Sequence, residues 1–183
     1  MKQGARIQSA IDILTRVSMS KIPMDNTIRD FMQFKRYIGS KDRAAIVELV
    51  YEIVRATARL NWWLEKVKAE DRVRTRTILY LALKEDNTLF HLNQLFDGEK
   101  YAPEALSDEE VEMVKAVEDK VLDDPDMPDA VRAECPPWAE ERLKELYGEK
   151  FEEELKAMLP PATLDLRVNT LQGDVKKAQD LLA

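Results

Sequence analysis

The alternation of apolar and polar residues is most regular over residues 40–64. Glu48, Glu52, Arg55 and Arg59 step by four, three and four positions there, which places them on one narrow polar stripe of a helix. Nearly all of the other positions in this stretch are apolar. A helix that is apolar almost all round is normally buried by neighbours on several sides. We therefore expect the first hundred residues to wrap around this helix.

Helical spacing of apolar residues also predicts most of the remaining elements, so the expected fold class is mostly α. Asp25 and Ser40 are expected to be N-caps, and Gly39 and Asn61 are expected to end helices. Ser107 begins a Ser-x-x-Glu capping box. The expected helices cover residues 5–18, 25–38, 40–60, 62–68, 71–83, 88–96, 107–121, 135–148, 151–159 and 174–182.

Residues 163–170 follow a different pattern. Apolar side chains at positions 164, 166 and 168 alternate with polar ones at 165, 167 and 169, which is typical of a strand. One strand cannot form a sheet by itself. We therefore expect this region to hold the first strand and helix of an incomplete α+β subdomain, with the rest of that domain missing.

The acidic, proline-containing residues 123–128 are the expected domain boundary. The predicted organisation is a helical domain over residues 1–126, a helical linker over residues 127–162, and the start of a further domain over residues 163–183.

Charge is distributed unevenly along the chain, whose net charge is −7. Residues 1–100 hold 18 Lys and Arg against 13 Asp and Glu, a balance of +5, whereas residues 101–183 hold 10 against 22, a balance of −12. This asymmetry indicates that a polyanionic partner would meet the first part of the chain. The acidic stretch over residues 104–134 is expected to be a solvated connector.

Other compositional features bound the class of protein. The chain has no apolar run of the length that spans a membrane and no apolar signal core near its N-terminus. Its single cysteine, Cys135, excludes an internal disulfide framework and fits a reducing compartment. We therefore expect a cytoplasmic protein with no membrane partner.

Two stretches together suggest a family. Residues 55–64 (Arg-Ala-Thr-Ala-Arg-Leu-Asn-Trp-Trp-Leu), which follow the apolar helix, resemble the all-helical NusB-like fold. Residues 136–138 (Pro-Pro-Trp), 146–148 (Leu-Tyr-Gly), 160–161 (Pro-Pro) and 166–170 (Leu-Arg-Val-Asn-Thr) resemble the segment that leads into Sun-type, or Fmu-type, small-subunit ribosomal RNA cytosine-5 methyltransferases.

This resemblance implies a NusB-like domain, then an RNA-binding subdomain, then a catalytic domain that uses S-adenosylmethionine. The catalytic part is expected to be absent from this chain, because its five glycines are isolated and none follows a strand. Cys135 lies between Glu134 and Pro136, in acidic surroundings that raise a thiol pKa, so it is expected to be a packing or linker residue. His91 has no partners at metal-ligand spacing. We therefore expect no catalytic, cofactor-binding or metal-binding residue, and an inactive chain.

The candidate site is a basic cluster around the Trp62-Trp63 corner, where at least one tryptophan is expected to anchor the core. Arginine suits phosphate and tryptophan offers a stacking surface. Two further candidates lie on the polar side of the predicted strand. The candidate RNA-binding residues are Arg55, Arg59, Lys66, Lys68, Arg72, Arg74, Arg76, Arg167 and Asn169.

Each candidate also has a purely structural interpretation. The basic cluster could be a solvated face paired with nearby carboxylates, and cations are favoured at a helix C-terminus whether or not RNA is bound. Arg167 could pair with Asp165, and Asn169 could open a turn. The carboxylates that could pair with the basic cluster are Glu52, Glu65, Glu70 and Asp71.

The preferred hypothesis is that the chain positions small-subunit ribosomal RNA, 16S rRNA, for the methyltransferase domain. One alternative is a NusB-type module of transcription antitermination, which binds protein as well as RNA through the helical domain. Another is a helical scaffold without affinity for nucleic acid. The first hypothesis predicts RNA binding that weakens with salt, and the second predicts binding that resists it.

Overall fold

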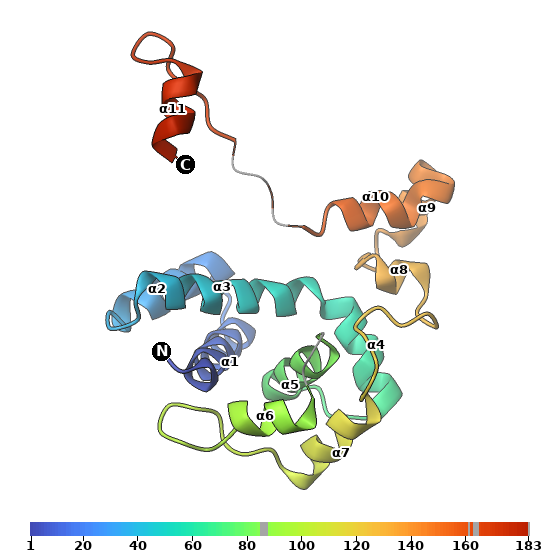
Figure 1. The fold of residues 1–183 in the computed structure, drawn as a ribbon. Helices are drawn as coiled ribbons and strands as arrows, with labels where there is room; N and C mark the ends of the chain where they lie inside the picture. Colours follow the sequence, from blue (N-terminus) through green and yellow to red (C-terminus); the bar gives the residue numbers. More distant parts are fainter. Residues whose placement is uncertain (85–87, 161, 163–164, 183) are drawn as a thin grey trace.

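The computed structural model describes residues 1–84, 88–160, 162 and 165–182, and these residues are mostly helical, as predicted. The helices follow one another along the chain and are joined by short connections (Figure 1). Their bounds are α1 (Gln3–Met19), α2 (Met24–Phe34), α3 (Ser40–Arg55), α4 (Thr57–Val67), α5 (Val73–Leu83), α6 (Leu89–Leu95), α7 (Asp108–Ala116), α8 (Asp129–Arg132), α9 (Glu140–Tyr147), the 3₁₀ helix η1 (Gly148–Lys150), α10 (Phe151–Ala157) and α11 (Val175–Leu182).

Helices α1 to α7 form the main bundle, and α5, rather than α3, is its most enclosed helix. Residues 77–81 and Leu83 of α5 are all buried, and α5 contacts α1, α3, α4, α6 and α7. Helix α3 buries only Ile46, Val50 and Ile53, against α1 and α5, while Val54 is 38% exposed. One face of α3 contacts solvent, through small apolar side chains such as Ala44 and Val54. The expectation that the chain wraps around residues 40–64 is therefore wrong.

The long helix predicted from Ser40 ends at Arg55 and not at Asn61. The chain turns at the buried Ala56, and Thr57 Oγ1 donates to the carbonyl oxygen of Val54 at 2.6 Å. Such side-chain-to-backbone bonds compete with the helical ladder. Asn61 then lies inside α4, so the proposed polar stripe is divided between two helices.

Helix ends test the predicted caps. The Ser107 hydroxyl accepts the N–H of Glu110, whose carboxylate accepts the N–H of Ser107, so the capping box is confirmed. The predicted N-caps at Asp25 and Ser40 are wrong, because Pro23 and Gly39 occupy the N-cap positions. Asp25 and Ser40 lie instead in the first turns of α2 and α3. Asp25 instead accepts a hydrogen bond from the Tyr51 hydroxyl of α3.

Several boundaries differ from those expected. Helix α2 ends at Phe34 instead of residue 38, and α7 ends at Ala116 instead of residue 121. The segment over residues 135–148 becomes helical only from Glu140, after a short helix, α8, that was not predicted. Pro136 and Pro137 explain the delay, because a proline disfavours the α conformation of the residue that precedes it.

The predicted strand over residues 163–170 lies partly outside the described residues. Its described positions, 165–170, form no strand. A strand is defined by backbone hydrogen bonds to a partner strand. Among the described residues, 165–168 make no backbone hydrogen bond, and the carbonyl oxygen of Asn169 accepts only from Gln172 and Gly173 of the following turn. The helix predicted after it is present as α11, from Val175 to Leu182.

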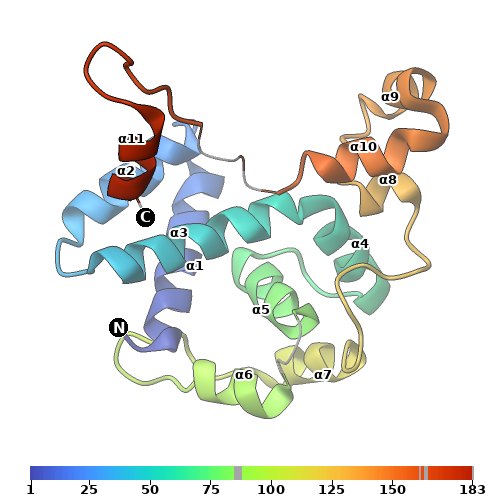
Figure 2. The same cartoon turned by 45° about the horizontal axis from the view of Figure 1, so that its top comes forward.

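Two hydrophobic cores hold the helices together. The main core draws on α1 to α7 and includes residues from Ile7 to Met127, whereas the second is small and is centred on Phe151 and Leu155. Helices α8 to α10, which surround the second core, lie beside α4 and away from α1 in both views (Figures 1 and 2). Each helix in the described segments is too short or too polar to cross a membrane.

Candidate nucleic-acid interface

Arg59 joins the main bundle to the segments that flank α8. Its Nη1 donates to Asp123 Oδ1 at 2.7 Å, and its Nε donates to Glu134 Oε1 at 2.8 Å. The same Glu134 carboxylate accepts the backbone N–H groups of Ala58 and Arg59, at 2.7 and 3.1 Å. It therefore caps the N-terminus of α4, where an anion is favoured. The Arg59 side chain is only 15% exposed, so its charge is already neutralised within the fold.

Lys66 is held by the acidic segment in a similar way. Its Nζ lies 3.1 Å from Asp124 Oδ2 and 3.6 Å from Asp126 Oδ2, and it sits 4.3 Å from the ring centroid of Trp62. Trp63 is buried, and its Nε1 donates to the carbonyl oxygen of Leu122 at 3.0 Å. The prediction that a tryptophan anchors the core is confirmed for Trp63.

Arg74 and Arg76 are also paired with carboxylates. Arg74 makes a two-point contact with Glu110, at 2.7 Å from Nε and 2.9 Å from Nη2, and it donates to the carbonyl oxygen of Ala105. Arg76 binds both carboxylate oxygens of Asp71. The bidentate fork geometry of Arg74 and Arg76 is the arrangement in which arginine holds an anion most firmly. A phosphate would have to displace these carboxylates to reach either side chain.

Lys68 and Arg72 line a hollow of about 560 Å³ between the α4–α5 connection and α7. Lys68 has a left-handed backbone and ends α4, and Arg72 is paired with Glu70. Both side chains are exposed. The hollow is also lined by carboxylates, namely Glu70, Glu109, Glu110 and Glu112. These negative charges disfavour a phosphate inside it.

The remaining candidates lie elsewhere. Arg55, in the last turn of α3, is half-buried and lies 5.3 Å from the ring centroid of Tyr51. Arg167 is exposed in the segment before α11. Asn169 Oδ1 accepts the N–H of Leu171 at 3.1 Å, so Asn169 opens a turn, as its structural interpretation anticipated. The nine candidates therefore do not form one continuous surface.

The acidic stretch is not a solvated connector, which corrects the expectation from charge alone. Asp123, Asp124 and Glu134 pair with cations of α4, and Glu110 pairs with Arg74 of α5. The basic and acidic halves of the chain meet because each neutralises the other on folding. The sequence contained both halves of these pairs, but their spacing along the chain gave no indication of which would meet.

A second basic surface was not singled out from the sequence. Residues 35–43 contain four bases and one acid, and Arg36 and Lys41 make no ion pair within the described part of the chain. Tyr37, in the same segment, is 71% exposed. A charge count over short windows, combined with the exposed aromatic residue, would have identified this segment.

Cys135 is buried and belongs to the second hydrophobic core. Burial raises the pKa of the Cys135 thiol, and the charge of Glu140 raises it further, as expected for a packing cysteine. The described residues do not fit S-adenosylmethionine, because none of them forms a strand that could lead into a glycine turn. Gly4, for example, is packed in α1 against the carbonyl oxygen of Leu95. Among the described side chains, no group of three or more His, Cys, Asp or Glu gathers where it could hold a metal ion.

Comparison with known proteins gives one match, over the C-terminal part of the chain. Residues 135–183 match the family model of the ferredoxin-like domain of RsmF/B-like methyltransferases. No curated protein and no solved structure matches the chain. The match begins at Cys135, next to Glu134, which caps α4, and it includes α9, α10 and α11. The C-terminal quarter of this chain is therefore similar to a domain of RsmF/B-like methyltransferases, which supports the part of the resemblance that rests on residues 136–170.

Proposed function

We propose that residues 1–183 form the RNA-binding N-terminal region of an S-adenosylmethionine-dependent 16S rRNA cytosine-C5 methyltransferase. In this role the chain positions small-subunit ribosomal RNA for a catalytic domain outside it and carries out no methyl transfer itself. The observation that carries the proposal is the match of residues 135–183 to the ferredoxin-like domain of RsmF/B-like methyltransferases. The function belongs to rRNA processing, and it places the protein in the cytoplasm.

The proposal assigns a role to each part of the chain. The helical bundle formed by α1 to α7 is the NusB-like domain, over residues 1–126, and α8 belongs to the linker that follows it. Helices α9 to α11 lie within the matched residues 135–183 and belong to the α+β RNA-binding subdomain. The order of a helical bundle followed by the matched segment supports this assignment. Exposed apolar side chains near the C-terminus, such as Leu171 at 94% and Leu181 at 79% exposed, are suited to packing against the rest of such a subdomain.

We rank the candidate RNA-binding residues predicted from the sequence by how strongly each is already paired with carboxylates of the fold. Arg55, Lys68 and Arg167 form no ion pair with another described residue, and the pair of Arg72 with Glu70 is exposed on both sides and therefore weak. We therefore assign these four the direct phosphate contacts, made at the exposed surface and not inside the hollow. The other basic members contribute only where RNA displaces part of their ion pairs. Asn169, whose side chain holds a turn, shapes the backbone next to Arg167.

A salt titration of RNA binding tests the proposal. Residues 1–183 are titrated against a 16S rRNA fragment in a filter-binding assay at several salt concentrations. Three to five phosphate contacts give a slope of log affinity against log salt of roughly −2 to −4. Absence of binding, or binding that salt does not weaken, would overturn the proposal, and salt-resistant binding would favour a protein-binding module instead.

Matched variants separate specific contacts from a general effect of charge. Lys68→Gln/Arg72→Gln removes two exposed cations of the proposed interface, and Lys120→Gln removes an exposed cation that follows α7 outside it. The double variant is expected to make the slope less steep by roughly 1.5. The Lys120 variant is expected to bind like the wild-type chain.

A further inference from the structure

A small hollow lies where α1 meets the loop between α2 and α3 and the loop between α6 and α7. Its volume is about 160 Å³, and its lining includes Gln8, Asp12, Lys35, Tyr37 and Tyr101. A cavity of about 150 Å³ in a protein interior is large enough to hold one benzene molecule. The hollow therefore has room for a single planar ring and not for a larger ligand.

Two tyrosines from distant parts of the chain line this hollow. Tyr37 is 71% exposed and Tyr101 is 68% exposed, so neither ring is held by core packing. Tyr101 has a backbone φ of 74°, a value that bulky residues adopt rarely and at a cost. Strained backbone of this kind is concentrated at functional sites. The fold therefore holds the backbone at Tyr101 in a costly conformation while its side chain remains exposed.

The hollow also offers polar groups to a bound ring. Gln8 Nε2 donates to Asp12 Oδ1 at 2.7 Å, and Lys35 Nζ donates to Asp12 Oδ2 at 3.2 Å. A carboxylate has about four acceptor positions, so Asp12 keeps acceptor capacity beyond these two bonds. The edge of a heterocycle can therefore find both donors and an acceptor in the hollow that the two tyrosines line.

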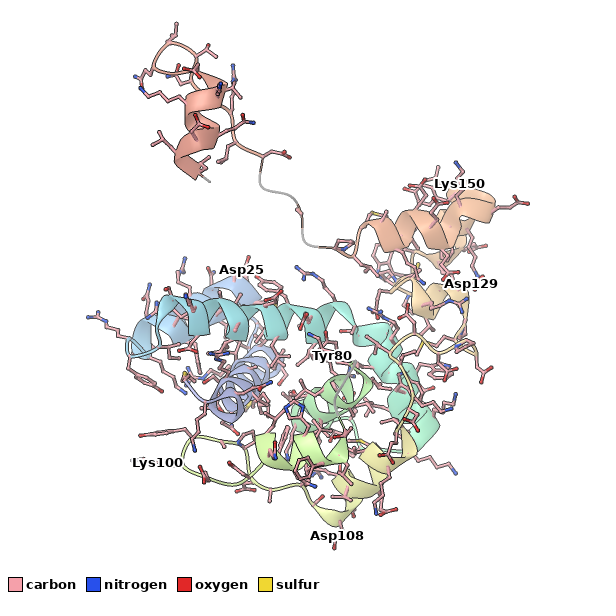
Figure 3. The ribbon with its side chains drawn as sticks, in the orientation of Figure 1. Asp25, Tyr80, Lys100, Asp108, Asp129 and Lys150 are labelled. Atoms are coloured by element: carbon pink, nitrogen blue, oxygen red, sulfur yellow. The ribbon has the colours of Figure 1, made fainter. Side chains whose placement is uncertain are left out.

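Cations without carboxylate partners lie close in sequence to the two tyrosines that line the hollow. Arg36, Lys41 and Lys100 are exposed, and none of them forms an ion pair with another described residue. Lys100 Nζ lies 5.2 Å from the ring centroid of Tyr101, and Lys100 extends outward from the α6–α7 loop (Figure 3). This surface differs from the cluster of residues 59–76, where most cations are neutralised by acids. A polyanion can therefore contact these three cations without displacing a carboxylate.

We propose that the hollow binds an unpaired nucleobase of single-stranded RNA, which stacks on Tyr37 and Tyr101 while Arg36, Lys41 and Lys100 contact the flanking phosphates. Aromatic side chains beside a positively charged groove are the general means by which proteins hold single-stranded RNA. The inference rests on the proposed function, and it adds a second point of RNA contact on the face of the bundle formed by α1, the α2–α3 loop and the α6–α7 loop.

Binding of a short RNA to tyrosine variants tests this inference. A fluorescein-labelled, single-stranded 12-nucleotide RNA of mixed sequence is titrated by fluorescence anisotropy, alongside the duplex of the same sequence. Tyr37→Ala/Tyr101→Ala is expected to bind the single strand about tenfold more weakly, which is roughly 1.4 kcal/mol. Tyr37→Phe/Tyr101→Phe keeps the stacking surfaces and is expected to bind within about twofold of the wild-type chain. Affinity for the duplex is expected to be unchanged in both variants.

A matched control removes an exposed aromatic ring elsewhere. Phe90→Ala, in α6, alters a side chain that is 73% exposed and does not line the hollow, and it should bind the single strand like the wild type. If the alanine pair binds as tightly as the wild type while wild-type binding to 16S rRNA still weakens with salt, the stacking site is wrong and the proposed function stands. If the wild-type chain binds no RNA, both proposals fail. Circular dichroism of each variant shows that the fold is intact.

Discussion

Removing the Glu134 carboxylate should destabilise the junction between α4 and α8. Glu134 is only 8% exposed, and it makes three hydrogen bonds: one from the Arg59 guanidinium and one each from the backbone N–H groups of Ala58 and Arg59. No other described side chain is hydrogen-bonded to those two N–H groups. Glu134→Ala therefore removes a helix cap and leaves a largely buried cation with one remaining partner, Asp123.

The size of the effect follows from these two losses. Loss of an N-cap costs about 1 kcal/mol, and removing one partner from a buried pair costs up to about 3–5 kcal/mol when no other partner remains. Because Arg59 keeps its 2.7 Å contact with Asp123, the second loss should be about 1–2 kcal/mol. The total is about 2–3 kcal/mol, which for a chain of this size lowers Tm by roughly 4–12 °C.

Urea and thermal unfolding of Glu134→Ala, followed by circular dichroism, measure this loss. Glu141→Ala is the matched control, because Glu141 is exposed in α9 and forms no ion pair with the described residues. The double variant Arg59→Met/Glu134→Ala should recover part of the stability, since it no longer leaves the cation buried. A loss below about 0.5 kcal/mol for Glu134→Ala would refute the reasoning, as would strictly additive effects in the double variant.

Three further predictions concern other parts of the chain. Gly4→Ala should lower Tm, although alanine normally favours a helix, because its Cβ would lie 2.6 Å from the carbonyl oxygen of Leu95; an unchanged or higher Tm would contradict the packing. Stability should fall as the pH decreases below about 4.5. Burial raises the pKa of Glu110, but hydrogen bonds and the charge of Arg74 outweigh burial and hold this pKa below its ordinary value. The stabilising contribution of Glu110 is therefore present above pH 4.5 and disappears as the carboxylate is protonated. Urea unfolding at pH 3 to 7 measures this fall, and Glu110→Gln should reduce the pH dependence. Arg72→Gln should make the salt slope of 16S rRNA binding less steep by roughly 0.7–0.9, and an unchanged slope in the filter-binding assay would remove Arg72 from the interface.

Local signals in the sequence predicted local features of the fold well. The first helix was expected over residues 5–18 and runs from Gln3 to Met19, and the capping box at Ser107 is present. Both depend on interactions within a few residues of each other, so a short stretch of sequence contains all of the information. The helix over residues 135–148 began late, because two prolines override the apolar spacing that follows them.

Burial was predicted less well, because it depends on neighbours that a single helix does not specify. The apolar composition of residues 40–64 indicated a fully surrounded helix, yet Val54 remains 38% exposed. Helix α5 is shorter but is the one surrounded by the bundle. Which of two apolar helices takes the central position depends on the lengths and directions of the connecting loops. Apolar composition alone could not distinguish the two.

The candidate site shows the same limit for charges. Periodicity assigns side chains to a shared face only while the helix continues, and the turn at Ala56 ends that relation between Arg55 and Arg59. Arg59 then meets Glu134, which is 75 residues away along the chain. A cation paired in this way stabilises the fold, and RNA can contact it only by displacing its carboxylate partner. The cations that can attract RNA are therefore those that the fold leaves without carboxylate partners. Whether Arg36 and Lys41 remain unpaired depends on where the fold places the acidic residues, and not only on the two basic residues themselves.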